Sequence, residues 1–176
     1  DNVQRSLANN SASYESKPEL PVFEVEWQAL IDSMSGERGI FNREAATKQA
    51  LKWGRRNPNH KFGTNPCAEI SLRSMQFCNL TEVVIRAEDT LETLIEKVRL
   101  ATIMGTFQST LVDFKYLNHK WRKNCEEERL LGVSLTGIMD NEVTSGQRGF
   151  ELLEEWLTKL HDVAVETNAA WAARLG

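Results

Sequence analysis

An asparagine, a cysteine and a glutamate alternate in the stretch GTNPCAEISL, residues 63–72, at Asn65, Cys67 and Glu69. In an extended chain successive side chains point to opposite faces, so residues two apart share a face and lie about 6–7 Å from one another. Pro66 favours an extended backbone at the residue before it. The pattern therefore predicts that an amide, a thiol and a carboxylate line one edge of an extended segment.

Three kinds of chemistry suit a cysteine placed between an amide and a carboxylate: metal binding, nucleophilic catalysis and radical transfer. Metal binding is poorly supported, because no Cys-x-x-Cys pair is present and His60, His119 and His161 have no ligand spacing. A nucleophilic cysteine usually needs a histidine base, which the motif lacks and the fold would have to supply from elsewhere. From residue types alone, a buried structural cysteine, with Asn65 and Glu69 satisfied by the backbone, is favoured over any catalytic role.

The composition is that of one globular domain. The 176 residues are 41% hydrophobic and 26% charged, which is enough apolar material for a core. A net charge of −4 argues against non-specific binding to nucleic acid or to an anionic membrane, and no apolar run is long enough to span a bilayer. Three cysteines, an odd number, favour a reducing compartment such as the cytoplasm. The chain begins at Asp1 without a methionine and ends within a helical pattern, so we expect a piece of a longer protein.

Helical patterns dominate the rest of the chain and must position the motif. Apolar spacing and capping signals predict five helices, at about 23–34, 42–53, 89–111, 118–128 and 150–176. Asn42 is the expected N-cap of the helix at 42–53. Asp89 and Glu92 form a capping-box-like start of the helix at 89–111. The apolar stripe of that helix includes Met104 and Leu111. Strands are predicted at 79–86 and 129–137, a loop at 54–66, and either strand or loop at 6–14. Helices alternating with short strands indicate an α/β architecture.

The motif and its surroundings resemble a known family. GTNPCAEISL, followed by FCNLTEV at 77–83, is similar to the active-site segment of ribonucleotide reductases, most closely to the monomeric ribonucleoside-triphosphate reductases of the adenosylcobalamin-dependent class. Three further stretches fit in the expected order, so the resemblance spans about residues 7–140: LANNSASY (7–14), SGERGIFNREA (35–45) and RLLGVSLTGIMD (129–140). Cys67 and Cys78 are 11 positions apart. That short interval resembles the cobalamin-dependent enzymes, whereas the di-iron class usually has a longer insertion.

The resemblance implies a fold as well as a motif. In that family a finger loop, corresponding to about residues 63–78, enters the centre of a ten-stranded α/β barrel with the reactive cysteine at its tip. We therefore expect residues 1–176 to be a helix-rich, partial catalytic barrel domain, with no second domain. Because half the barrel and the redox partner of Cys78, which lies upstream in the family, are missing, we expect this chain alone to be inactive.

The resemblance also implies roles for individual residues. Cys67 would become a thiyl radical and abstract the 3′-hydrogen of the ribonucleotide, and Glu69 would act as general base on the 3′-hydroxyl while the 2′-hydroxyl leaves as water. Asn65 would align the ribose through its hydroxyls. Cys78 would be one half of the dithiol that supplies two electrons. Residues expected near the substrate are Asn10, Ser11 and Pro66.

The implied cofactor is adenosylcobalamin, a cobalt coenzyme whose binding residues are not identifiable in this sequence. The implied partners are a ribonucleoside di- or triphosphate substrate, a thioredoxin-like or dithiol reductant and the rest of the parent chain, in the cytoplasm of a prokaryote or encoded by a phage. No nucleic-acid or membrane partner is expected, and Cys125 has no counterpart in the family's chemistry. Two alternatives stay open: a fragment of a di-iron (class I) ribonucleoside-diphosphate reductase large subunit, and a non-catalytic α/β interaction module that retains the motif.

Overall fold

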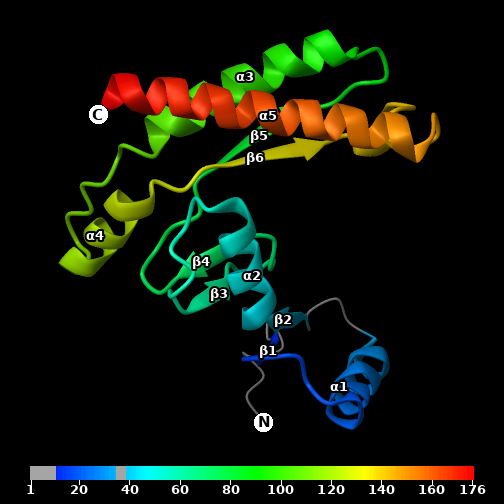
Figure 1. Cartoon of the computed structure of the whole chain (residues 1–176), viewed down its shortest axis with the longest axis vertical. Helices are drawn as coiled ribbons and strands as arrows, with labels where there is room; N and C mark the ends of the chain where they lie inside the picture. The colour runs from blue at the N-terminus through cyan, green and yellow to red at the C-terminus, as the bar shows by residue number, and fades with distance from the viewer. Residues whose placement is uncertain (1–10, 35–38) are drawn as a thin grey trace. The chain divides into compact units, whose positions relative to one another are not determined.

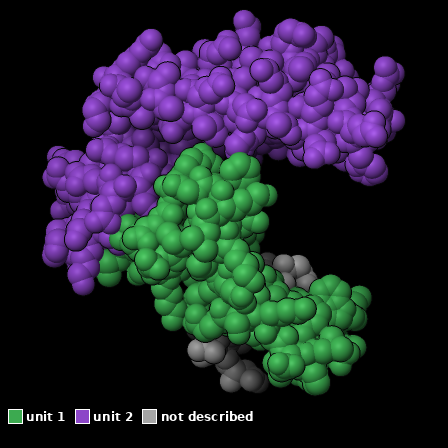
Figure 2. Space-filling model, in the orientation of Figure 1, with its two compact units in different colours: residues 1–77 green, residues 78–176 purple. Residues whose placement is uncertain are grey.

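The computed structural model describes residues 11–34 and 39–176 (Figure 1). The chain divides into two compact units, residues 1–77 and 78–176, which Figure 2 distinguishes by colour. The first unit contains β1 (Ala12–Tyr14), α1 (Leu20–Ser33), β2 (Ile40–Asn42), α2 (Arg43–Trp53), β3 (Phe62–Thr64) and β4 (Ser71–Arg73). The second contains β5 (Leu80–Val84), α3 (Leu91–Gln108), α4 (His119–Glu128), β6 (Gly132–Thr136), the 3₁₀ turn η2 (Ile138–Asp140) and α5 (Phe150–Leu175).

Each described sheet has two strands. β1 pairs with β2 and β5 pairs with β6, both in parallel, while β3 and β4 form an antiparallel hairpin. The mixed α/β composition confirms the predicted fold class. The strands of the described residues do not close into a barrel, so the ten-stranded barrel stays a prediction.

Helices α1 and α2 of the first unit begin close to the predicted positions. α1 has a proline in its first turn, where a missing N–H leaves no helical bond unmade. The described part of the chain buries no side chain of α1, and Trp27 and Ile31 remain 53% and 52% exposed. Asn42 caps α2 as predicted, because its side chain accepts a hydrogen bond of 3.1 Å from the Ala45 amide. Local capping chemistry therefore determines where α2 begins.

The second unit is organised around α3 and α5, which pack along one another (Figure 1). Residues of these helices and of β5 with its extension form one buried cluster: Val83, Ile85, Leu94, Val98, Ala101, Leu160 and Val163. The predicted strand at 79–86 and the final helix are confirmed by β5 and α5. The period-two burial of Val83 and Ile85 shows that β5 turns one face to the helices.

The start and the buried stripe of α3 differ from the sequence prediction. Thr90, and not Asp89, is the N-cap, and Thr93 completes a reciprocal capping box in place of Glu92. Threonine serves here because a hydroxyl can both donate and accept. Met104, expected on the apolar stripe, is 68% exposed. Leu111, expected in the last turn, is 63% exposed and lies beyond the end of α3 at Gln108.

Small residues occupy the buried side of the later turns of α3. Thr102 and Thr106 are buried, and each hydroxyl donates to the carbonyl four residues earlier at 2.7 Å. Asn168 of α5 donates to the Thr106 hydroxyl at 2.9 Å. The threonine hydroxyls are thus satisfied without water, which allows polar residues to replace the predicted apolar ones.

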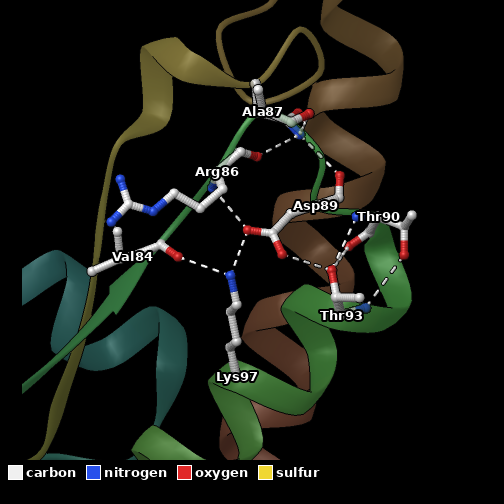
Figure 3. A network of polar contacts seen from close by, with 8 residues as sticks. Val84, Arg86, Ala87, Asp89, Thr90, Thr93 and Lys97 are labelled. Atoms are coloured by element: carbon white, nitrogen blue, oxygen red, sulfur yellow. Dashed lines mark hydrogen bonds and ion pairs between the residues drawn. The ribbon is translucent and has the colours of Figure 1, made fainter.

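Asp89 connects the end of β5 to the first turn of α3 (Figure 3). Its carboxylate, 6% exposed, accepts hydrogen bonds from the Arg86 amide at 2.8 Å, the Thr93 hydroxyl at 2.8 Å and the Lys97 ammonium at 2.6 Å. Lys97 also donates to the Val84 carbonyl at 3.0 Å. Burial alone raises the pKa of Asp89, but the hydrogen bonds from Lys97, Arg86 and Thr93 outweigh it, and the net pKa lies below the ordinary value of 3.8.

The Asp89 network predicts a specific dependence of stability on pH. A carboxyl group whose pKa is lowered on folding stabilises the fold above the unfolded pKa and loses that contribution as pH falls through the folded pKa. The free energy of unfolding of the 176-residue chain should therefore fall as pH drops from about 5 towards 2, and Asp89→Asn should reduce that fall. Denaturant titrations at each pH measure it, with Asp113→Asn, exposed in the same unit, controlling for the lost charge. Equal pH slopes in wild type and Asp89→Asn would contradict the assignment.

Gly137 marks a position where the second unit has no room for a side chain. Its φ is +73°, and a Cβ there would lie 2.3 Å from the Ile85 carbonyl oxygen. We expect Gly137→Ala to lower the free energy of unfolding by about 3 kcal/mol, since a left-handed conformation and a backbone clash add together. Gly146 has a similar φ of +82° but only ordinary contacts at 3.6 Å or more. Gly146→Ala should therefore lower the free energy of unfolding by only about 1–2 kcal/mol when both variants are titrated with urea. An equal loss in both variants would contradict the clash.

Candidate active site

The motif lies on the hairpin formed by β3 and β4. Phe62 lies opposite Arg73 and Thr64 opposite Ser71, and residues 65–70 connect the two strands. Two arginines that are not part of this hairpin donate hydrogen bonds to its strand carbonyls. Arg43 Nε donates to the Phe62 carbonyl at 2.8 Å, and Arg56 donates to the Ser71 carbonyl at 2.7 Å, with its guanidinium 4.6 Å from the centre of the Phe62 ring. The sequence gives no sign of these two hydrogen bonds, because contacts across 15 to 19 positions leave no periodic signal.

The predicted extended run through residues 65–69 is wrong, because the chain reverses there. The Ala68 amide donates to the Asn65 carbonyl at 3.0 Å, which closes a β-turn with Pro66 at its second position. Proline suits that position because its fixed φ matches the turn. Ala68 then has a φ of +64°. The proline read as support for extension is therefore part of a turn.

Asn65 closes the loop with both its backbone and its side chain. It is 7% exposed. Its amide nitrogen donates to the Ile70 carbonyl at 3.2 Å, and its side-chain oxygen accepts from the Ile70 amide at 3.1 Å. Its side-chain nitrogen donates to Glu69 Oε1. One asparagine thus makes the hydrogen bonds that hold the two ends of the loop together.

Two of the three motif side chains contact one another in the structure, and the third is a solvent-exposed thiol. Asn65 and Glu69 are joined by a hydrogen bond, whereas Cys67 is an exposed free cysteine at the third position of the turn. Pro66 and Glu69 are also exposed. A buried amide, an accessible thiol and an accessible carboxylate on one short loop can act on a ligand that approaches the end of the hairpin.

The other predicted site residues have varied surroundings. Cys78 is exposed and lies two residues before β5, in the second unit. Ser11 is half-buried next to β1, and a Cβ on Gly39 would lie 2.9 Å from its hydroxyl oxygen. Asn10 lies outside the described residues. Cys125 is a partly buried free cysteine of α4.

Neither a metal centre nor a membrane span is found among residues 11–34 and 39–176. No group of three or more His, Cys, Asp or Glu side chains there could hold a metal ion. Within the same ranges, no helix combines the length and the apolar composition that a transmembrane segment requires.

One curated protein provides a comparison with this site. The chain is 31% identical over 118 residues to an adenosylcobalamin-dependent ribonucleoside-triphosphate reductase of Lacticaseibacillus paracasei. The match covers 64% of this chain but only 15% of that reductase. A stretch of that length within 176 residues necessarily includes Cys67 and Cys78. The chain is thus a distant relative of an oxidoreductase, and no protein-family model and no solved structure matches it.

The loop geometry predicts the effect of removing the Asn65 side chain. Asn65→Ala should lose the acceptor of the Ile70 amide, so that this amide exchanges its hydrogen roughly ten times faster, as expected when about 1–2 kcal/mol of local stability is lost. Asn57→Ala is a matched control, because the Asn57 side chain accepts from the Asn59 amide at 3.0 Å in the neighbouring loop. Hydrogen exchange followed by NMR should show increased exchange at Ile70 only in the first variant. Unchanged protection of Ile70 in Asn65→Ala would contradict the closure by the side chain.

Proposed function

We propose that this chain carries the radical cysteine of an adenosylcobalamin-dependent ribonucleotide reductase, which converts ribonucleotides to 2′-deoxyribonucleotides for DNA synthesis. One observation supports it above the others: the Asn-Pro-Cys-Ala-Glu-Ile loop places an exposed Cys67 at the end of a hairpin, within the span of similarity to such a reductase. Since that span covers 15% of the reductase, the rest of the catalytic barrel comes from other residues.

Cys67 carries out the hydrogen transfer in this proposal. As a thiyl radical it takes the 3′-hydrogen of the ribose, which leaves a carbon radical on the sugar and restores the thiol. S–H and activated C–H bonds are similar in strength, so the same thiol can return a hydrogen to C3′ after reduction. The exposed position of Cys67 on the turn gives a ribose direct access to the sulfur.

Glu69 and Asn65 assist the loss of the 2′-hydroxyl. The Glu69 carboxylate takes the proton of the 3′-hydroxyl, and the 2′-hydroxyl leaves as water with a proton from the thiol pair that includes Cys78. The hydrogen bond from the Asn65 side chain to Glu69 Oε1 orients that carboxylate on the loop. An amide has two N–H donors, so Asn65 can hold Glu69 and still offer a donor to a ribose hydroxyl.

Cys78 supplies the reducing equivalents together with a second cysteine outside this chain. Two thiols give up two electrons and two protons and close to a disulfide, which balances the loss of water and the gain of hydrogen at C2′. A thioredoxin-like protein or a small dithiol then reduces the disulfide. Exposure of Cys78 is consistent with exchange against an external thiol.

The proposal assigns no residue of this chain to the coenzyme, whose cobalt is held by the nitrogens of its own corrin ring and not by a cluster of side chains. The coenzyme would supply the radical when bound, through residues of the remainder of the enzyme.

Variants in a hybrid enzyme test these roles. The matching segment of the Lacticaseibacillus paracasei reductase is replaced by the corresponding residues of this chain, and deoxyribonucleoside triphosphate formation is measured. Cys67→Ser should abolish the reaction, because an O–H bond is too strong to break reversibly in this role. Glu69→Gln should lower kcat by about 10²–10⁴-fold, the usual contribution of a general base. Cys78→Ser should stop multiple turnover while the hydrogen transfer at C3′ survives.

Release of tritium from the 3′ position of the substrate separates the phenotypes. It should persist in Cys78→Ser and vanish in Cys67→Ser, each compared with the parent hybrid that retains both cysteines. Tritium release that survives Cys67→Ser would end the radical assignment.

A further inference from the structure

A shallow depression of about 410 Å³ lies beside the β3–β4 hairpin, wholly within the first unit. Three of the side chains that line it are cationic: Arg43, Lys61 and Arg73. Thr64 and Ser74 add hydroxyl groups to the lining. Its volume falls within the range of small-ligand sites, about 300–1,000 Å³.

The depression belongs to a basic region of an acidic chain. Residues 43–73 contain seven lysines and arginines against two glutamates, whereas the whole chain has a net charge of −4. The local excess of positive charge attracts anions, which the chain as a whole repels.

The carboxylate of Glu15 forms ion pairs with two of the three cations. Its Oε1 forms an ion pair with Arg43 and lies 3.2 Å from Lys61 Nζ. The hydrogen bond from Lys61 and the positive charge of Arg43 lower the pKa of Glu15, which is therefore charged at neutral pH. The Glu15 side chain is 66% exposed, so an external anion can displace it without unfolding the unit. Arg43 and Lys61 can therefore hold one anionic oxygen between them.

Arg43 is held in position for this contact. Its Nε donates to the Phe62 carbonyl at 2.8 Å, which anchors the guanidinium against the hairpin. A guanidinium presents five donors in a planar fork that matches the oxygens of a phosphate group. The two bonds to Phe62 and Glu15 leave donors of Arg43 to contact more than one anionic oxygen.

We propose that this depression binds the di- or triphosphate group of a small molecule, in competition with the carboxylate of Glu15. Three cations and two hydroxyls around one small hollow suit several adjacent phosphates better than a single carboxylate. A nucleic-acid strand would need a longer basic surface than this depression offers. The inference does not depend on the radical chemistry of Cys67, because no residue of the depression takes part in that reaction.

Calorimetric titration of the 176-residue chain with inorganic triphosphate tests the site. Lys61→Gln should weaken binding about tenfold, the value of one charge-assisted contact. Glu15→Gln should strengthen it several-fold, because the internal competitor is removed. Lys48→Gln is the matched control: Lys48 is exposed, lies in the same basic region and pairs with Glu44, but does not line the depression. It should leave the affinity within about twofold of the wild type.

Titrations with ATP, sulfate and a single-stranded oligonucleotide distinguish the possible ligands. Tighter binding of ATP than of triphosphate identifies a nucleotide, and equal binding identifies the phosphates alone; both support the site. Equal losses in Lys61→Gln and Lys48→Gln would reduce the effect to general charge and overturn it. Binding of sulfate as tight as that of triphosphate would indicate an adventitious ion only, and tighter binding of a single-stranded oligonucleotide would assign the surface to nucleic acid instead. Either result refutes the proposal.

Discussion

The close approach of α3 to β5 and to the start of β6 is the constraint on which the second unit depends. A Cβ added at Gly105 would lie 2.0 Å from Leu131 Cδ1 and 3.3 Å from Thr81 Cγ2. Asn79 holds the same junction together, since its side-chain nitrogen donates to the carbonyls of Gly105 and Leu130, each at 2.9 Å. A two-stranded sheet has only marginal stability in isolation. The packing of α3 against β5 and β6 buries apolar surface and thereby stabilises the pair of strands.

The first unit is stabilised differently, by polar contacts to a short hairpin. A six-residue connection between three-residue strands has few ladder hydrogen bonds of its own. Asn65 closes the connection, while Arg43 and Arg56 bind the strand carbonyls from outside. The open apolar surface of α1 is consistent with this organisation, because the described part of the chain gives α1 little to pack against.

Asn65 combines a structural and a proposed catalytic role in one side chain. Its hydrogen bonds to Ile70 determine the shape of the loop, and its hydrogen bond to Glu69 positions the proposed base. The hydrogen bond between the Asn65 and Glu69 side chains accounts for the pairing of these two residues although the segment is not extended. The residues that hold the loop closed also orient the groups beside the thiol, which is the preorganisation that a reactive site requires.

Sequence alone determined the features that depend on neighbouring residues. Asn42 caps α2 because capping needs only the next three residues, and the helices of the second unit follow from period 3.6 over many positions. The sequence also showed that an amide, a thiol and a carboxylate lie within one five-residue segment, at Asn65, Cys67 and Glu69. The actual capping residue of α3 was missed by one position, since Asp89 and Thr90 are both good caps.

Tertiary structure decided what local patterns leave open. Pro66 is compatible with an extended segment and with a turn, and the pairing of β3 with β4 selected the turn. Met104 fitted the apolar stripe of α3, but contact with α5 buried Thr102 and Thr106 instead, because their hydroxyls are satisfied within the helix pair. The cations around the hairpin came together from positions up to 30 residues apart. Contacts between residues so far apart in the sequence leave no local pattern, so they can be identified only in the folded structure.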